Sequence, residues 1–168
     1  MDVAALLIEI YGRIPSLSRR AVDGVPSDRL AEAPGPGRNT IAWLIWHVAR
    51  VQDAQVAELL GDHQLWTSGD WASRMGLAAD PHDTGYAHTP EQVAAVRPPD
   101  GRVLLDYLDA VAARTETFLK DLGPDDLDRV VDHRWDPPVT LGVRLVSVAD
   151  DCVQHAGQAA YVRGLIGA

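Results

Sequence analysis

Four long segments of this sequence carry apolar residues at spacings of three and four positions. This spacing places the apolar side chains on one stripe of an α-helix, and such a stripe must be buried against another element. The segments are residues 3–20, 41–60, 102–122 and 141–166. The sequence therefore predicts an all-α fold, a four-helix bundle in which the four stripes face a common core.

Residues near the expected helix ends refine these boundaries. Pro15 lies inside the first segment and predicts a kink or an early end near Ile14. Asn39 or Thr40 can provide the N-cap oxygen of the second helix, and Gly123 follows the third helix as a terminating residue. The first half of the second helix is apolar on nearly all sides, so we expect this helix to be central in the bundle.

Residues 61–100 differ in composition from the segments on either side. They are rich in Gly, Pro, Asp and His, and the pattern predicts only one short helical turn, at residues 71–75. The bundle should therefore have a long crossover between its second and third helices. Connections of this length inside a compact domain usually serve a function, such as covering a site. Residues 125–140 are expected to be irregular, with one extended turn and no strands.

Length and charge exclude several classes of protein. A chain of 168 residues predicts one domain spanning residues 1–168. Its 24 acidic residues outnumber 15 basic ones, and the net charge of -9 disfavours nucleic acid and anionic lipid surfaces as partners. No apolar run approaches the roughly 20 residues needed to span a membrane, and the N-terminal residues lack the features of a signal peptide. We therefore expect a cytoplasmic protein, and a single cysteine, Cys152, agrees with a reducing compartment.

Two of the six histidines lie on the expected core faces of helices. His47 lies in the apolar half of the second helix, and His155 lies on the apolar stripe of the fourth. Asp151 precedes His155 by four residues, so these two side chains share one face of the helix, and Gln158 continues the same stripe. The remaining histidines fall in expected loops: His63, His82, His88 and His133. We assign His82 and His88 to solvent.

His47, Asp151 and His155 form a candidate metal site. They would offer two neutral nitrogens and one charged oxygen, a set that suits zinc and leaves open coordination positions. An inward-facing aspartate also needs compensation, because an unpaired buried carboxylate is costly. That need is equally met if Asp151 pairs with Arg50 or Arg144, and a buried histidine is often a hydrogen-bonded core residue. The spacing alone leaves both interpretations open.

Polar residues beside the candidate site also have two interpretations each. Arg50 and Asp53 follow His47 on the second helix. In one interpretation they orient the ligands or grip a substrate carboxylate. In the other, which is the commoner case, they form a solvated edge of the helix. Gln158 is a further supporting candidate. Cys152 is favoured as a small buried hydrophobe over a minor ligand. No second histidine is placed to activate this cysteine, so the pattern offers no protein nucleophile.

The five tryptophans divide between core and loop positions. Trp43 and Trp46 lie in the apolar half of the second helix, where filling the core is the favoured interpretation over lining a pocket. Trp66 and Trp71 lie in the polar crossover and are candidates for a pocket or an interface. Trp135 lies in the irregular segment and is a candidate for either pocket or core.

Two motifs resemble those of a known family. Residues 40–47 are Thr-Ile-Ala-Trp-Leu-Ile-Trp-His, and residues 151–158 are Asp-Cys-Val-Gln-His-Ala-Gly-Gln. Both are similar to the corresponding helices of the DinB-like superfamily, whose thiol-dependent branch includes mycothiol-dependent S-transferases and maleylpyruvate isomerase. The similarity covers most of the chain in helix order, in length and in the long second connection.

The resemblance implies a divalent metal ion, commonly zinc or nickel, held by His47, Asp151 and His155. The family usually has His or Glu where this chain has Asp151, and the shorter side chain weakens the expectation for metal identity and affinity. A thiol that coordinates such an ion loses its proton near neutral pH and becomes a nucleophile.

Two functions follow as expectations. The first is a metal-dependent thiol S-transferase, in which a low-molecular-weight thiol, mycothiol by resemblance, attacks an electrophilic small molecule. The second is a non-catalytic metal- or ligand-binding stress protein of the same fold, which the departure at Asp151 suggests. The resemblance also implies a homodimer.

Overall fold

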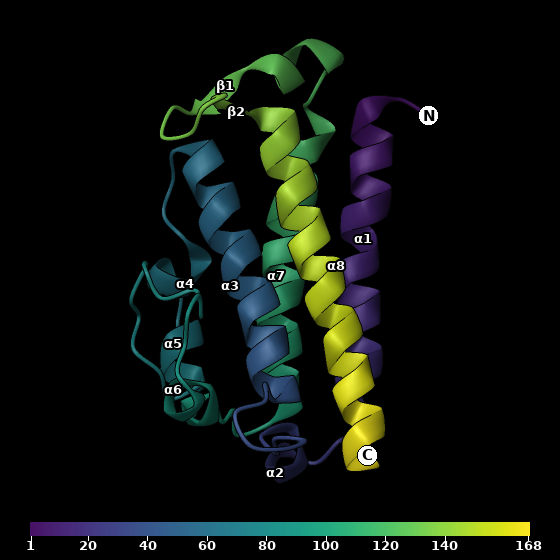
Figure 1. Ribbon diagram of the computed structural model, residues 1–168. Helices are drawn as coiled ribbons and strands as arrows, with labels where there is room; N and C mark the ends of the chain where they lie inside the picture. Colours follow the sequence, from purple (N-terminus) through teal and green to yellow (C-terminus); the bar gives the residue numbers. More distant parts are fainter.

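The computed structural model describes residues 1–168 and confirms the all-α, four-helix fold (Figure 1). Four long helices lie side by side: α1 (Val3–Val22), α3 (Ile41–Leu60), α7 (Gly101–Lys120) and α8 (Leu141–Ile166). Because α1 and α3 each pack against both α7 and α8, the four apolar stripes enclose a common core. No helix combines the length and the apolar character needed to cross a membrane.

Capping side chains determine where two of these helices begin. The Asp2 carboxylate accepts a hydrogen bond from the Ala5 amide at 2.8 Å at the start of α1. The Thr40 hydroxyl accepts from the Trp43 amide at 3.0 Å, so Thr40 is the N-cap of α3. These contacts satisfy amides that have no partner inside the helix.

The early end predicted for α1 is wrong. The helix continues through Pro15 to Val22. Proline removes one backbone hydrogen bond, but the side chains of Ile14 and Ser18 are fully buried on either side of it. Packing of the apolar stripe therefore overrides the local preference of the proline.

The crossover between α3 and α7 contains more helix than the sequence predicts. It comprises α4 (Leu65–Ser68), α5 (Trp71–Arg74) and α6 (Pro90–Ala95), of which only α5 was expected. A capping box begins α6: the Gln92 amide donates to the Thr89 hydroxyl, and the Gln92 side chain accepts from the Thr89 amide. In Figure 1 these short helices lie together beside α3.

The ends of the bundle carry the remaining short elements. These are α2 (Ser27–Leu30), the 3-10 helix η1 (Pro124–Asp128), β1 (Val130–Asp132) and β2 (Val139–Thr140). The expectation of no strands is therefore wrong, although the two antiparallel strands are too short for an alternating pattern to show in the sequence. Trp135 lies between them and is 67% exposed, so it belongs neither to the core nor to a buried pocket.

Asp132 connects this two-stranded sheet to α8. Its carboxylate accepts hydrogen bonds from the Arg134 side chain at 2.8 Å and from Arg144 of α8 at 2.9 Å. The hydrogen bonds from Arg134, supported by the charge of Arg144, hold the pKa of the Asp132 carboxyl well below its usual range. A lowered pKa stabilises the folded state at every pH above the pKa of the unfolded chain.

In Asp132→Asn, the unfolding free energy should therefore depend less on pH at acidic pH than in the wild type. The unfolding free energy of the wild type should fall as the pH drops through and below about 4, the pKa of an unfolded aspartate, because only the folded carboxyl resists protonation. Urea unfolding at pH values between 6 and 2 would measure the two slopes. Asp128→Asn, which removes the same charge from an exposed position, is the control. Parallel slopes for wild type and Asp132→Asn would contradict this role.

Candidate functional site

Helices α3 and α8 bring together the three side chains expected to form a site. His47 comes from α3, and Asp151 and His155 come from adjacent turns of α8. One possible ligand atom from each residue lies within 4.8 Å of the others. Asp151 Oδ2 is 3.8 Å from His47 Nε2, and Asp151 Oδ1 is 3.5 Å from His155 Nε2. A single carboxylate therefore faces both imidazole rings.

The cluster is buried on the α3 side and reachable from solvent on the α8 side. The His47 side chain is buried, whereas the side chains of His155 and Asp151 are 20% and 38% exposed. Within Asp151, however, the Oδ2 atom is itself buried and accepts no hydrogen bond. An unpartnered buried carboxylate oxygen is unfavourable unless a cation approaches it.

Hydrogen bonds to the far side of each ring orient both histidines. Nδ1 of His47 donates to the carbonyl oxygen of Thr84, which can only accept, so in the neutral ring Nε2 carries a lone pair. Nδ1 of His155 lies 2.9 Å from Gln158 Oε1 and donates to it in the same way. Both Nε2 lone pairs then face the Asp151 carboxylate. This is repulsive unless a cation or a proton lies between them.

The protonation of the cluster follows from burial and from the two ion pairs. Burial lowers the pKa of His47 and outweighs the opposing bond to Thr84, so this ring is neutral near pH 7. The contact with Asp151 raises the pKa of His155 against the effect of burial. Burial alone would raise the pKa of Asp151, but the two imidazoles outweigh it and lower this pKa. Asp151 is therefore a carboxylate.

These residues fit a divalent metal ion. Two imidazole nitrogens and one carboxylate oxygen form a donor set of the kind that binds zinc or nickel. Metal-binding histidines typically donate their other ring N–H to a carbonyl or carboxylate, as His47 does to Thr84. The unpartnered Asp151 Oδ2 is the atom that such a cation would satisfy.

The alternative partners for Asp151 are engaged elsewhere. The Arg144 guanidinium contacts Glu58 at 3.0 Å and Asp132 at 2.9 Å. Arg50 lies 3.6 Å from Asp53. The interpretation in which Asp151 pairs with either arginine is therefore wrong.

The sequence interpretation of Arg50 as part of a solvated edge is also wrong. Its side chain is 0% exposed, and its guanidinium donates into the crossover. The acceptors include the carbonyl oxygen of Asp83 at 3.0 Å and the side-chain oxygen of Gln64 at 2.9 Å. The guanidinium is fully buried and hydrogen-bonded to the protein through all three nitrogens, so it is not accessible to a substrate carboxylate.

Asp53 completes this buried connection. Its carboxylate accepts hydrogen bonds from the backbone amides of Leu65 and Trp66 at 3.0 and 2.8 Å, and from the Tyr107 hydroxyl at 2.8 Å. Asp53 thereby holds the start of the crossover, as Arg50 holds its middle. Neither residue touches the cluster, and both fix the segment whose Thr84 carbonyl orients His47.

Gly85 allows the crossover to approach His47 closely. Its φ of +91° is in the region that favours glycine. A Cβ atom at this position would lie 2.9 Å from the Trp46 ring and 3.0 Å from His47 Nδ1. A side chain at residue 85 would therefore displace the ring that carries the first ligand nitrogen.

His88, which the sequence assigns to solvent, is a largely buried part of this arrangement. Its side chain is 10% exposed and its Nε2 lies 2.8 Å from Asp83 Oδ1. Its Nδ1 accepts a hydrogen bond from Trp43 Nε1 at 3.1 Å, and its ring stacks on Trp46. Both ring nitrogens are occupied, so His88 supports the loop. A single histidine in a polar segment carries no sequence signal for such a role.

The tryptophans and Cys152 complete the surroundings of the cluster. Trp43 stacks on His47 with ring centroids 4.8 Å apart, which supports the core interpretation for this residue and for the buried Trp46. Trp66 is buried in the core, contrary to the prediction of a pocket or interface, and Trp71 packs partly buried against it. Burial raises the pKa of the Cys152 thiol, whose sulfur faces the Val48 carbonyl. Cys152 is the small buried hydrophobe that the sequence predicts.

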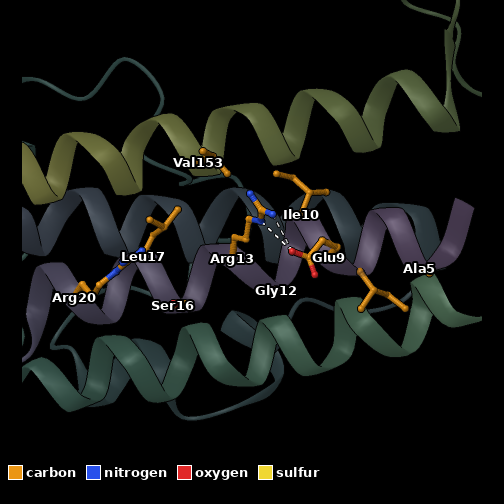
Figure 2. A pocket seen from close by; sticks show the side chains of 10 residues that line it. Ala5, Glu9, Ile10, Gly12, Arg13, Ser16, Leu17, Arg20 and Val153 are labelled. Atoms are coloured by element: carbon orange, nitrogen blue, oxygen red, sulfur yellow. Dashed lines mark hydrogen bonds and ion pairs between the residues drawn. The ribbon is translucent and has the colours of Figure 1, made fainter. Parts of the chain in front are cut away.

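A hollow of about 820 Å³ lies on a different face of the bundle (Figure 2). It is lined mainly by α1, and Val153 contributes from α8. The ion pair between Glu9 and Arg13 borders it. None of the three cluster residues lines this hollow, so the candidate site and this surface are separate.

Comparisons with known proteins agree with this architecture. A family model described as the DinB superfamily matches residues 11–159, which include all three cluster residues. A crystal structure described as that of a conserved protein of a locus from Enterococcus faecalis is 35% identical in sequence, with a TM-score of 0.91. The similarity covers 99% of this chain and 98% of that one. A search of curated proteins gives no match.

Gly85→Ala should damage the site through its backbone and its contacts. The substitution strains a positive φ and also forces a methyl group against His47 and Trp46. Gly76→Ala is the matched control, because Gly76 has a φ of +69° and open space around it. We expect Gly85→Ala to cost about 1–3 kcal/mol more stability than Gly76→Ala, and to lower zinc affinity at least about tenfold. Urea unfolding and competition with a chelating dye measure the two effects; equal losses in both variants would contradict this role of Gly85.

Arg50→Met should destabilise the protein far more than removal of a surface arginine. It leaves the Asp83 carbonyl without a donor and removes the nearer of the two guanidiniums beside the buried Asp53, with Arg114 remaining at 3.8 Å, for an expected cost of about 3–5 kcal/mol. Arg74→Met breaks an exposed pair with Asp106 and should cost no more than about 1 kcal/mol. Chemical unfolding of the two variants measures both values. A loss below about 1 kcal/mol for Arg50→Met would contradict the anchoring role.

Proposed function

This chain belongs to the DinB superfamily, and we propose that it is a metal-dependent thiol S-transferase of that family. The observation that carries the proposal is the pair of histidine Nε2 atoms that face one aspartate with an unpartnered oxygen. The three groups form a donor set that suits a cation, and the partly exposed Asp151 lies on the side where a further ligand would approach. We propose that this ligand is the sulfur of a low-molecular-weight thiol, mycothiol by resemblance.

A divalent ion bound here would lower the pKa of a coordinated thiol, so that thiolate is present near neutral pH. His47 and His155 contribute neutral nitrogen donors, and Asp151 contributes the charge that balances part of the cation. Thr84 and Gln158 hold the two rings with Nε2 directed inward. Trp43 covers His47 and excludes water from its side of the site.

The proposed reaction joins two small molecules. The thiol sulfur forms a bond to an electrophilic carbon of the second substrate. Either a leaving group departs with its bonding pair, or the pair of a π-bond moves to the neighbouring atom, which takes up a proton from solvent. The thiol proton passes to solvent, which reaches the site past Asp151 and His155. No protein nucleophile is needed, and the buried thiol of Cys152 is not placed to act as one.

One observation favours the alternative, a non-catalytic metal- or ligand-binding protein of the same fold. Asp151 and His155 already form an ion pair that raises the pKa of the imidazole. A proton shared by this pair can balance the carboxylate without any metal. The short side chain of Asp151 limits its reach toward a metal shared with His47. The homodimer and the cytoplasmic location expected from the sequence remain predictions.

Metal analysis of the untagged protein tests the site. Purified without chelator, the wild type should carry about one equivalent of zinc or nickel by inductively coupled plasma mass spectrometry, and His155→Ala and Asp151→Asn should carry almost none. His82→Ala, which removes an exposed crossover histidine, is the matched control and should match the wild type. Absence of metal from the wild type, even after zinc titration, would refute the metal site.

A screen of the zinc-loaded protein then separates the two functions. Mycothiol with a panel of electrophiles should give product at a rate that is lost in His155→Ala. The loss of free thiol over time measures this rate. A loaded protein without turnover on any electrophile would exclude the transferase, and the binding protein would then be favoured.

A further inference from the structure

A second hollow, of about 500 Å³, is lined in part by Gln158, the residue that orients His155. It lies between the N-terminal half of α3 and the C-terminal half of α8, and residues of the loop before α3 form its third wall. Its lining includes Arg38, Asn39, Leu44, Gln158, Tyr161 and Val162. We call it the Arg38 hollow.

Gln158 connects the Arg38 hollow to the cluster. Gln158, which lines it, is the residue whose side chain accepts the hydrogen bond of His155 Nδ1. Gln158 follows His155 by three residues, a rise of about 4.5 Å along the helix. On the opposite wall, Leu44 precedes His47 by three residues. A molecule in the hollow would therefore lie about one helical turn from the ligand atoms.

The charge of the hollow is opposite to that of the chain. One arginine and no carboxylate line it, whereas the whole chain carries a net charge of -9. Arg38 is exposed. It also borders a neighbouring hollow lined by Asp28 and Glu32, but Glu32 pairs with Arg29 at 3.1 Å and neither carboxylate pairs with Arg38. The Arg38 guanidinium is therefore available to an external anion, with which arginine forms bidentate hydrogen bonds.

The buried position of Arg50 makes Arg38 the relevant cation. The sequence suggests Arg50 as a grip for a substrate carboxylate, but all of its donors point into the protein core and the crossover. The hollow also offers apolar contact through Leu44, Val162 and Leu165 beside the exposed ring of Tyr161. An apolar surface with one cation suits a small organic acid.

We propose that the Arg38 hollow binds the electrophilic substrate, and that this substrate carries a carboxylate that pairs with Arg38. The inference rests on the proposed transferase function, since it places the second substrate beside the activated thiol. The apolar wall holds the carbon skeleton, and Gln158 separates the skeleton from the cluster. Volume is sufficient, because small-molecule sites commonly measure about 300–1,000 Å³.

Binding is tested first, without any need for turnover. The probes are 3-nitrobenzoate and its uncharged methyl ester, titrated into the full-length protein with detection by two-dimensional amide NMR. The acid should bind wild type and Arg38→Lys, and should bind Arg38→Gln at least about tenfold more weakly, since a charge-assisted bond is lost. Arg129→Gln removes an exposed arginine near the two-stranded sheet, at the opposite end of the bundle (Figure 1), and should match the wild type.

Turnover provides the second arm. With mycothiol and zinc-loaded protein, 4-chloro-3-nitrobenzoate would form a carbon–sulfur bond while chloride leaves and the thiol proton passes to the buffer. Arg38→Gln should raise KM for the acid at least about tenfold and leave KM for its methyl ester unchanged. Comparing variants on one substrate removes the difference in intrinsic reactivity between acid and ester.

The two arms distinguish the proposals. Equal binding of acid and ester by the wild type, or equal acid affinity in Arg38→Gln and wild type, would overturn the Arg38 hollow as a carboxylate site. Turnover that is independent of Arg38 would overturn the hollow and leave the transferase intact. Arg38-dependent binding, together with no turnover of any electrophile in the panel, would support the hollow as an anion site while refuting the transferase.

Discussion

The buried guanidinium of Arg50 is the interaction on which the rest of the structure depends. This side chain extends from α3, a central helix of the bundle. It donates hydrogen bonds to the Asp83 carbonyl and the Gln64 side chain, while Asp53 balances its charge. A charge removed from water is tolerated only when its hydrogen bonds and its counter-charge are supplied by the protein. The crossover supplies them, so the bundle and the crossover must fold as one unit.

The geometry of the candidate metal centre depends on the crossover that Arg50 anchors. His155 is oriented by Gln158 on its own helix, three residues away, whereas His47 is oriented by the backbone of Thr84 in the crossover. Gly85 permits that approach, and His88 with Asp83 holds the loop against the tryptophan rings. One ligand is thus positioned by a helix and the other by a long connection anchored at Arg50.

Charge is distributed so that two arginines near the site have different roles. Arg50 is enclosed and structural, and Arg38 is open to solvent in a hollow that lacks carboxylates. In a strongly acidic chain, one unpaired guanidinium beside the cluster marks where an anion is tolerated. The thiol and its electrophile would then meet between a half-exposed aspartate and this hollow, with Gln158 contacting both.

The periodicity of the sequence determined the four helices, and the spacing of Asp151 and His155 determined which residues of α8 share a face, because both depend on local helical geometry. The sequence could not place His88, Trp66 or the carbonyl of Thr84, since a residue of the crossover is located by distant contacts and a backbone atom leaves no signature in residue type. The early end expected at Pro15 failed for the same reason: buried neighbours outweighed a local preference. Only the tertiary structure decided that Asp151 faces two imidazoles rather than an arginine, because the packing of α3 on α8 directs both arginines elsewhere.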